Sequence, residues 1–277
     1  MISKAELSKK SKEWNIRFDI VEKDFCIGWL LKGVAEEPRF KKYLIFKGGT
    51  ALRKCYFQDH RFSEDLDFTA LNELARENLD STFSNICKRV SDESGCEFQL
   101  LSFEQSREVP EEEAYEARIS FRGPTQPQNV KPVIKVDLTF YEQVVLPPLS
   151  KTIIHPYSDA FQTKVLVYSL EEILAEKLRA ILQQKGRIPR PRDFYDVWAL
   201  LKIHYERMEL KEIRETFLKK CRFKNVSFRS NEDFFDAVLL QKNKSAWESS
   251  IGRQVHALVS FDQVIQELKI KLQEALG

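Results

Sequence analysis

The sequence predicts an α+β protein, in which a mixed β-sheet flanked by helices is followed by a helical C-terminal region. Two observations predict this fold class. Up to about residue 168, short apolar runs with period-two alternation are separated by stretches with helical spacing. From residue 169 to the end the pattern is helical throughout. We therefore expect an α/β domain with N-terminal helices over residues 1–168 and a helical domain over residues 169–277.

The first 70 residues are expected to alternate between helices and short strands. Residues 1–40 carry an apolar stripe at helical spacing, which ends at Glu37-Pro38. The elements that follow are a strand over residues 42–46, a Gly-Gly-Thr turn, a helix over residues 51–57 and a strand that contains Asp65 and Asp67.

The remainder of the first domain follows the same rules. Apolar residues at helical spacing predict a helix over residues 70–94, which Ser94-Gly95 ends. Alternating or extended patterns predict further strands over residues 98–103, 116–122, 133–140 and 161–168. Ser169 with Glu172 three residues later forms a capping-box pattern, which opens a helix through about Gln184.

The composition is that of an ordinary globular protein. The chain has 277 residues, of which 43% are hydrophobic and 31% charged, enough for a large core. Its 44 Lys and Arg residues and 42 Asp and Glu residues give a net charge of +2, so any nucleic-acid surface must be local.

The cysteines and the hydropathy of the sequence indicate the cellular compartment. The cysteines are odd in number and lack CxxC spacing, which argues against a disulfide framework or a structural zinc site and favours a reducing, cytoplasmic environment. There is no signal-peptide pattern and no apolar run of membrane length, so we expect neither secretion nor a membrane partner.

Asp65 and Asp67 are the strongest candidates for chemistry. If their segment is a strand, both carboxylates point to one face, and Leu66 and Phe68 point to the other. Two carboxylates held side by side repel each other, and a divalent metal is the usual remedy. The alternative is a strand edge with two solvated carboxylates.

The glycines upstream add a second element of the same chemistry. Gly48 and Gly49 precede a helical stretch, where a phosphate can approach backbone N–H groups and the helix dipole favours an anion. Thr50 belongs to the same turn. Ser63, two residues before Asp65, either contacts a phosphate or satisfies a turn. Together the turn and the acids indicate phosphoryl-transfer chemistry.

Asp137 is a third acidic candidate. It lies within an otherwise apolar and β-branched strand, where its alternative role is a solvent-facing residue of an exposed sheet face. Three carboxylates on neighbouring strands can hold two Mg²⁺ ions for in-line displacement at phosphorus, with a nucleoside triphosphate (NTP) as substrate.

The helical region contains a further basic cluster. Lys177 lies on the helix after Ser169, and a turn with three arginines spans residues 186–192. Guanidinium groups such as that of Arg192 suit triphosphate or RNA phosphates, although a solvated turn accounts for them equally. Asp193 or Asp196 is expected to cap the helix that follows.

With these motifs identified, the chain resembles the AbiEii/AbiGii toxin family, bacterial nucleotidyltransferases of the DNA polymerase β-like superfamily. The resemblance rests on motifs within residues 15–205, which are Lys47-Gly-Gly-Thr-Ala-Leu-Arg53, Arg61-Phe-Ser-Glu-Asp-Leu-Asp-Phe68, Lys135-Val-Asp-Leu138, Lys177 and Arg192-Asp-Phe-Tyr-Asp196.

The resemblance implies a nucleotidyltransferase fold and a role for each motif. The Gly-Gly-Thr turn would hold nucleotide phosphates, and Asp65, Asp67 and Asp137 would bind Mg²⁺. Lys177 and Asp193 would line the nucleotide or acceptor site. Members of the family are typically toxins of toxin–antitoxin or phage-defence pairs, and some transfer nucleotides to the 3′ end of tRNA.

These expectations define a leading function and two alternatives. The leading function is Mg²⁺-dependent transfer of a nucleoside monophosphate (NMP) from an NTP to an RNA acceptor, a tRNA 3′ end, by a toxin with a cognate antitoxin. The first alternative is a non-catalytic nucleotide- or partner-binding module with the same fold. The second is a metal-dependent nuclease, since two metals and carboxylates also cleave phosphodiesters.

Overall fold

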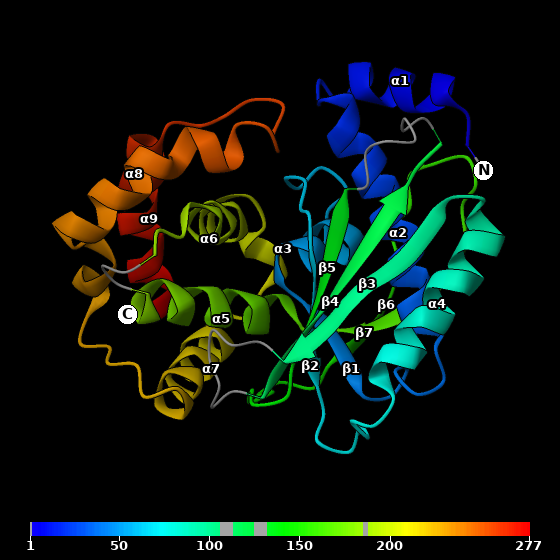
Figure 1. The fold of residues 1–277 in the computed structure, drawn as a ribbon. Coiled ribbons are helices and arrows are strands. Elements are labelled where there is room, and N and C mark those ends of the chain that lie inside the picture. The colour runs from blue at the N-terminus through cyan, green and yellow to red at the C-terminus, as the bar shows by residue number, and fades with distance from the viewer. Residues whose placement is uncertain (1, 106–112, 125–131, 185–187) are drawn as a thin grey trace. The chain divides into compact units, whose positions relative to one another are not determined.

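The structure, a computed structural model, describes residues 2–105, 113–124, 132–184 and 188–277. The chain divides into two compact units. The sheet unit comprises Met1–Glu142 and Pro148–Val167, and the helical unit comprises Gln143–Pro147 and Tyr168–Gly277. The fold class predicted from the sequence is confirmed, because a mixed sheet with flanking helices is followed by helices only (Figure 1).

The sheet unit begins with two helices where the sequence indicated one helical region. Helix α1 spans Lys4–Glu13 and helix α2 spans Phe18–Glu36, so the helical pattern ends at Glu37-Pro38 as predicted. Most of α2 is buried, including the polar residues Glu22 and Asp24. A buried helix with polar side chains must provide them with partners, and the partners of Asp24 prove to lie near the glycine turn.

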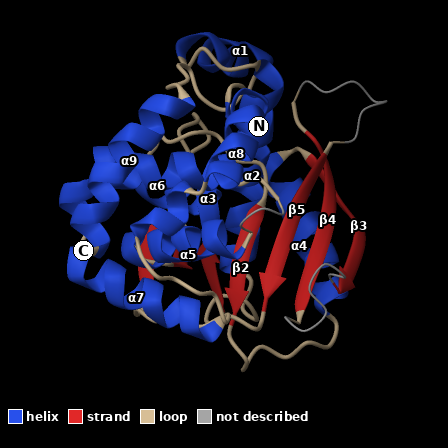
Figure 2. Cartoon of the chain, turned by 90° about the vertical axis from the view of Figure 1, so that its left-hand side faces the viewer, coloured by secondary structure: helices blue, strands red, loops and turns tan. Residues whose placement is uncertain are grey.

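The sheet has seven strands in the order β3-β4-β5-β2-β1-β7-β6. Figure 2 shows β3, β4, β5 and β2 side by side. Strand β1 pairs in parallel with β7, and β2 pairs in parallel with β5, whereas the other neighbours are antiparallel. The strands are β1 (Leu44–Lys47), β2 (Leu66–Ala70), β3 (Glu97–Gln105), β4 (Ala114–Arg122), β5 (Val133–Thr139), β6 (Leu149–Thr152) and β7 (Lys164–Val167).

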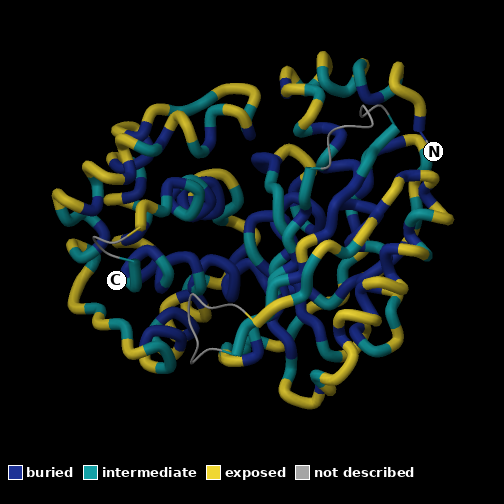
Figure 3. Tube along the Cα trace, in the orientation of Figure 1, coloured by how far each residue is buried: buried dark blue, intermediate teal, exposed yellow. Residues whose placement is uncertain are grey.

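Alternation along the strands puts the core on one face of the sheet. In β5, Ile134, Val136 and Leu138 are fully buried, whereas the residues between them are half-buried. Helix α4 (Leu79–Ser94) packs against β3 and β4, and Gly95 ends it in the left-handed conformation. Figure 3 shows that burial follows the central strands and α2.

Several local predictions differ from the structure. The strand expected to contain both Asp65 and Asp67 begins only at Leu66, so Asp65 lies just before it. The predicted helix over residues 70–94 begins only at Leu79, after Asn78, whose φ of 56° is left-handed. The predicted strand over residues 161–168 is shortened to β7, and β6 was not predicted at all. The helix expected at residue 51 begins at Gly48 as α3 (Gly48–Ala51) and continues as a π-helix, Leu52–Tyr56.

The helical unit contains five longer helices among the described residues. They are α5 (Leu170–Gln183), α6 (Pro191–Ile203), α7 (Leu210–Phe223), α8 (Ala237–Ile251) and α9 (Phe261–Leu276), with short 3₁₀ turns at Tyr205–Arg207 and Asn231–Phe235. None of the described helices is long and apolar enough to cross a membrane.

The capping box predicted at Ser169 is confirmed only in its first half. The Ser169 hydroxyl accepts a hydrogen bond from the Glu172 backbone N–H at 3.2 Å. The Glu172 carboxylate instead binds Lys220 Nζ at 2.7 Å and accepts the backbone N–H of Leu146 at 2.8 Å. A buried lysine offers a carboxylate a stronger partner than a helix N-terminus does, and the contact secures residues 143–147 to the helical unit.

Candidate active site

Two of the predicted metal ligands are direct neighbours on adjacent strands. Asp67 in β2 and Asp137 in β5 are paired in the parallel register. Paired residues of neighbouring strands project to the same face of a sheet, so both carboxylates lie on the face opposite the apolar core. Asp65 immediately precedes β2, two residues before Asp67, and belongs to the same cluster of acids.

The pKa of Asp137 reflects its burial and the negative charges around it. Burial, followed by the charges of Asp67, Glu116 and Asp65, raises the pKa of Asp137 to about 7, and Lys135 opposes the rise. A carboxyl among carboxylates resists ionisation because each added negative charge repels the others. The arrangement is therefore one that a bound cation would stabilise.

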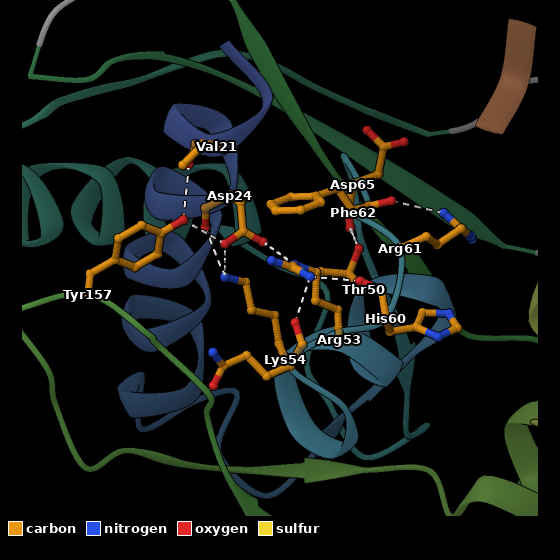
Figure 4. A network of polar contacts seen from close by, with 11 residues as sticks. Val21, Asp24, Thr50, Arg53, Lys54, His60, Arg61, Phe62, Asp65 and Tyr157 are labelled. Carbon is orange, nitrogen blue, oxygen red and sulfur yellow. Dashed lines mark hydrogen bonds and ion pairs between the residues drawn. The ribbon is translucent and has the colours of Figure 1, made fainter. Parts of the chain in front are cut away.

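Gly48 brings the glycine turn into contact with these acids. Gly48 has a φ of 78°, and a Cβ atom built on it would lie 2.5 Å from Asp67 Oδ2. The carboxylate of Asp67 thus occupies the space that any side chain at position 48 would need. The Thr50 hydroxyl also donates a hydrogen bond to the Asp65 carbonyl oxygen (Figure 4). The turn and the acidic pair are one local structure, which explains why only glycine fits at position 48.

A Gly48→Ala substitution is expected to disable this site. The left-handed backbone costs roughly 1–2 kcal/mol with a Cβ atom, and the added methyl group displaces the Asp67 carboxylate. A displacement of this kind lowers activity by about 10²-fold. The matched control is Gly95→Ala, at the left-handed end of α4 with a φ of 72°. Thermal unfolding should show that both variants are destabilised, and activity assays should show the loss of about 10²-fold only in Gly48→Ala.

Glu116 is a fourth carboxylate in this row that the sequence did not single out. It pairs with Asp137 across β4 and β5, and its carboxylate binds Lys135 Nζ at 2.6 Å and Arg118 Nη1 at 3.1 Å. These cations lower the pKa of Glu116, although burial alone would raise it. Its position at the start of a predicted strand was visible in the sequence, but its strand partner was not.

A buried network behind the glycine turn was also missed. Asp24 in α2 binds Arg53 Nε at 2.9 Å and Lys54 Nζ at 2.8 Å, and it accepts a hydrogen bond from the Tyr157 hydroxyl at 2.8 Å (Figure 4). Both cations belong to the π-helix that follows α3. An acidic residue on an apolar helix stripe was the one available signal for this network.

The chemistry of the aspartates fits a hard divalent cation such as Mg²⁺, which prefers carboxylate oxygens. Like-charge repulsion at Asp137, described above, supports this fit. Within the part of the chain that the structure describes, no three His, Cys, Asp or Glu side chains are arranged as a preformed metal site. Asp65, Asp67 and Asp137 would therefore hold a metal after side-chain adjustment.

The helical unit brings its own predicted residues together. Lys177 Nζ in α5 binds Asp193 Oδ1 at 2.8 Å and Asp196 Oδ2 at 2.7 Å, both in α6, and the three side chains are largely buried. The prediction that Asp193 or Asp196 caps α6 is wrong. The helix begins at Pro191 with Arg190 as N-cap, and no side chain caps it. Both aspartates lie within α6, where they pair with Lys177 of α5.

The remaining predicted residues have less distinctive surroundings. Arg192 Nε donates to the Ser250 carbonyl oxygen at 3.4 Å within the helical unit. Residues 186–187 of the basic turn lie outside the described residues, and Arg190 pairs with Asp193 at 3.5 Å. Gly49 and Thr50 lie in α3, and half-buried Ser63 lies before β2.

Solved structures from two bacteria share this fold with the chain. MenT4, a nucleotidyltransferase toxin from Mycobacterium tuberculosis, has a TM-score of 0.60 and 22% identity, covering 100% of this chain and 98% of its own. JHP933 from Helicobacter pylori has a TM-score of 0.58 and 16% identity, covering 94% of this chain and 93% of its own. No curated protein matches the chain.

A family of nucleotidyltransferases matches most of the chain. The sequence profile described as "Nucleotidyl transferase AbiEii toxin, Type IV TA system" matches residues 29–267. The chain belongs to this family, which confirms the resemblance noted from its motifs. It is a nucleotidyltransferase toxin of the type IV toxin–antitoxin class.

Proposed function

We propose that the protein transfers an NMP from an NTP to an RNA acceptor, the 3′ end of tRNA, in a reaction that requires Mg²⁺. The single observation that carries the proposal is the pairing of Asp67 with Asp137 on adjacent strands, with Gly48 packed against Asp67. A triphosphate and its metal ions need carboxylates on one side and accessible backbone N–H groups on the other.

Each group has a distinct part in the proposed reaction. Asp65, Asp67 and Asp137 would hold two Mg²⁺ ions, and bound Mg²⁺ would neutralise the triphosphate and lower the pKa of the attacking hydroxyl. Gly48, Gly49 and Thr50 would contact the phosphates, with Ser63 nearby in the sequence. The RNA hydroxyl oxygen forms a bond to the α-phosphorus, and the bond to the leaving pyrophosphate breaks.

The predicted residues of the helical unit are also part of the proposal. Lys177 and Asp193 form a buried pair that we propose lines the nucleotide or acceptor site. Arg192 would contact phosphate. Membership of the type IV toxin–antitoxin family supports a cognate antitoxin as partner and NTP as substrate. We propose a cytoplasmic location, where both NTP and tRNA are available, and a role in phage defence.

A transfer assay tests the proposal directly. The protein is incubated with total tRNA, Mg²⁺ and each of the four labelled NTPs in turn, and labelled RNA is resolved by electrophoresis. We expect label at the tRNA 3′ end with at least one NTP, and none when EDTA removes Mg²⁺. Shortened RNA without any NTP requirement would indicate a nuclease instead. Nucleotide binding by folded protein without labelling or cleavage would indicate a non-catalytic binding module.

A further inference from the structure

Asp24 ties helix α2 to the segment that follows the glycine turn. The residue is 1% exposed, and its carboxylate accepts hydrogen bonds from Arg53, Lys54 and Tyr157. Burial alone would raise the pKa of Asp24, but the charges of Lys54 and Arg53 outweigh it and hold the pKa well below its usual range. The carboxylate is therefore ionised throughout the physiological range and acts as a permanent anchor.

Arg53 extends this anchor to the loop that leads to the acidic pair. Its Nη1 atom donates to the carbonyl oxygens of Gln58 at 2.8 Å and His60 at 2.7 Å. Its guanidinium carbon lies 3.5 Å from the centroid of the Phe62 ring. The residue is 4% exposed, so water does not compete for these contacts. Figure 4 shows Arg53 between Asp24 and the loop segment that contains His60 and Phe62.

We propose that Asp24 and Arg53 form a positioning pair, which sets the place of the Asp65–Asp67 carboxylates relative to the glycine turn. Asp24 fixes the guanidinium through Nε. The guanidinium in turn holds the carbonyl groups of Gln58 and His60 and lies over the Phe62 ring. Metal ligands must be held to within about 0.5 Å. The Thr50 hydrogen bond to the Asp65 carbonyl oxygen holds this segment from the side of the glycine turn, and Arg53 holds the loop that leads to it. The inference rests on the proposed function in taking these carboxylates as metal ligands.

Two neighbours of Asp24 distinguish positioning from general stability. Lys54 donates to the Asp24 carboxylate and carbonyl oxygen, and Tyr157 donates to the carboxylate and to the Val21 carbonyl oxygen. Neither has a hydrogen bond to residues 58–62 among those of the described chain. Variants at these two positions should therefore weaken the buried network without releasing the loop.

The test measures Mn²⁺ binding, as a probe for the metal site, by titration calorimetry in the absence of nucleotide and RNA. Arg53→Lys keeps the positive charge, but its single side-chain nitrogen cannot reproduce the contacts to Asp24, Gln58 and His60. We therefore expect Mn²⁺ binding to be at least about tenfold weaker. Lys54→Met and Tyr157→Phe should lower the melting temperature while keeping the Mn²⁺ dissociation constant within about twofold of wild type, because neither releases the loop.

A second variant keeps the proposal testable if Arg53→Lys does not fold. Asp24→Asn combined with Lys54→Met leaves the cluster with its original net charge but removes the anchor of Arg53. We expect Mn²⁺ binding at least about threefold weaker than in Lys54→Met alone, in line with losses of supporting contacts around metal ligands.

Three results would overturn the positioning role. These are wild-type Mn²⁺ affinity in Arg53→Lys, a loss of affinity that tracks melting temperature across all the variants, or no Mn²⁺ binding by the wild-type protein. Because the titration contains neither NTP nor RNA, it is independent of the transfer assay. A missing RNA product would overturn the proposed function while leaving the measured link between Arg53 and metal binding intact.

Discussion

Asp67→Asn is expected to reduce nucleotidyl transfer by about 10³-fold, which is the upper end of the range for the loss of one preorganised electrostatic group. Asp67 links the two parts of the candidate site. It pairs with Asp137 on the neighbouring strand, and its carboxylate occupies the space that a Cβ atom at position 48 would need. An amide is neutral and binds Mg²⁺ much less strongly than a carboxylate does. The protein should fold normally, because the substitution preserves side-chain volume.

The matched control for this variant is Glu64→Gln. Glu64 lies between Ser63 and Asp65, and its partly exposed carboxylate pairs with Lys23 at 3.5 Å. Exposed ion pairs contribute little to stability, so this variant should remain close to wild type. Pyrophosphate release with saturating NTP, Mg²⁺ and tRNA measures both variants. Equal activity of Asp67→Asn and wild type would contradict the assignment of Asp67 as a metal ligand.

The second large effect is expected at Asp137, where loss of activity should accompany a gain in stability. The pKa of Asp137 is raised from 3.8 to about 7 by burial and neighbouring carboxylates. The folded state therefore holds this proton more tightly than the unfolded state does, and stability falls as the pH rises from about 4 to 7. Above pH 7 the folded protein bears the full cost of the ionised carboxylate.

Asp137→Asn removes that cost. After discounting for partial exposure, we expect the variant to be about 1–2 kcal/mol more stable than wild type at pH 8 in EDTA, and the difference should vanish near pH 4. Mg²⁺ should stabilise the wild-type protein at pH 8 and have little effect on the variant. Urea unfolding at the two pH values measures this. A variant that is less stable than wild type at pH 8 would contradict the electrostatic account.

The sequence predicted the fold where strong periodicity decides local structure. Alternation over residues 133–140 predicted β5, and the Ser169 pattern predicted the start of α5. Periodicity could not reveal β6, a short and largely exposed strand that depends on pairing with β7. Likewise, periodicity could not reveal that Arg53 and Lys54 of the π-helix Leu52–Tyr56 both bind Asp24, which lies about 30 residues earlier in the chain.

The candidate site shows the same division. The motif spacing singled out Asp65, Asp67 and Asp137, and the parallel pairing of β2 with β5 makes two of them neighbours. Glu116 could not be predicted, because its role depends on the register of β4 against β5. Asp193 was expected at a helix cap because local rules favour it there, whereas Lys177 from another helix is its actual partner.

The position of the transferred phosphorus tests the central claim most directly. The protein is given tRNA, Mg²⁺ and NTP labelled either at the α- or at the γ-phosphate. Nucleotidyl transfer at acids gathered around Mg²⁺ predicts that RNA acquires only the α label with wild-type protein, and no label with Asp67→Asn. Transfer of the γ label, or α labelling that persists undiminished in Asp67→Asn, would contradict it.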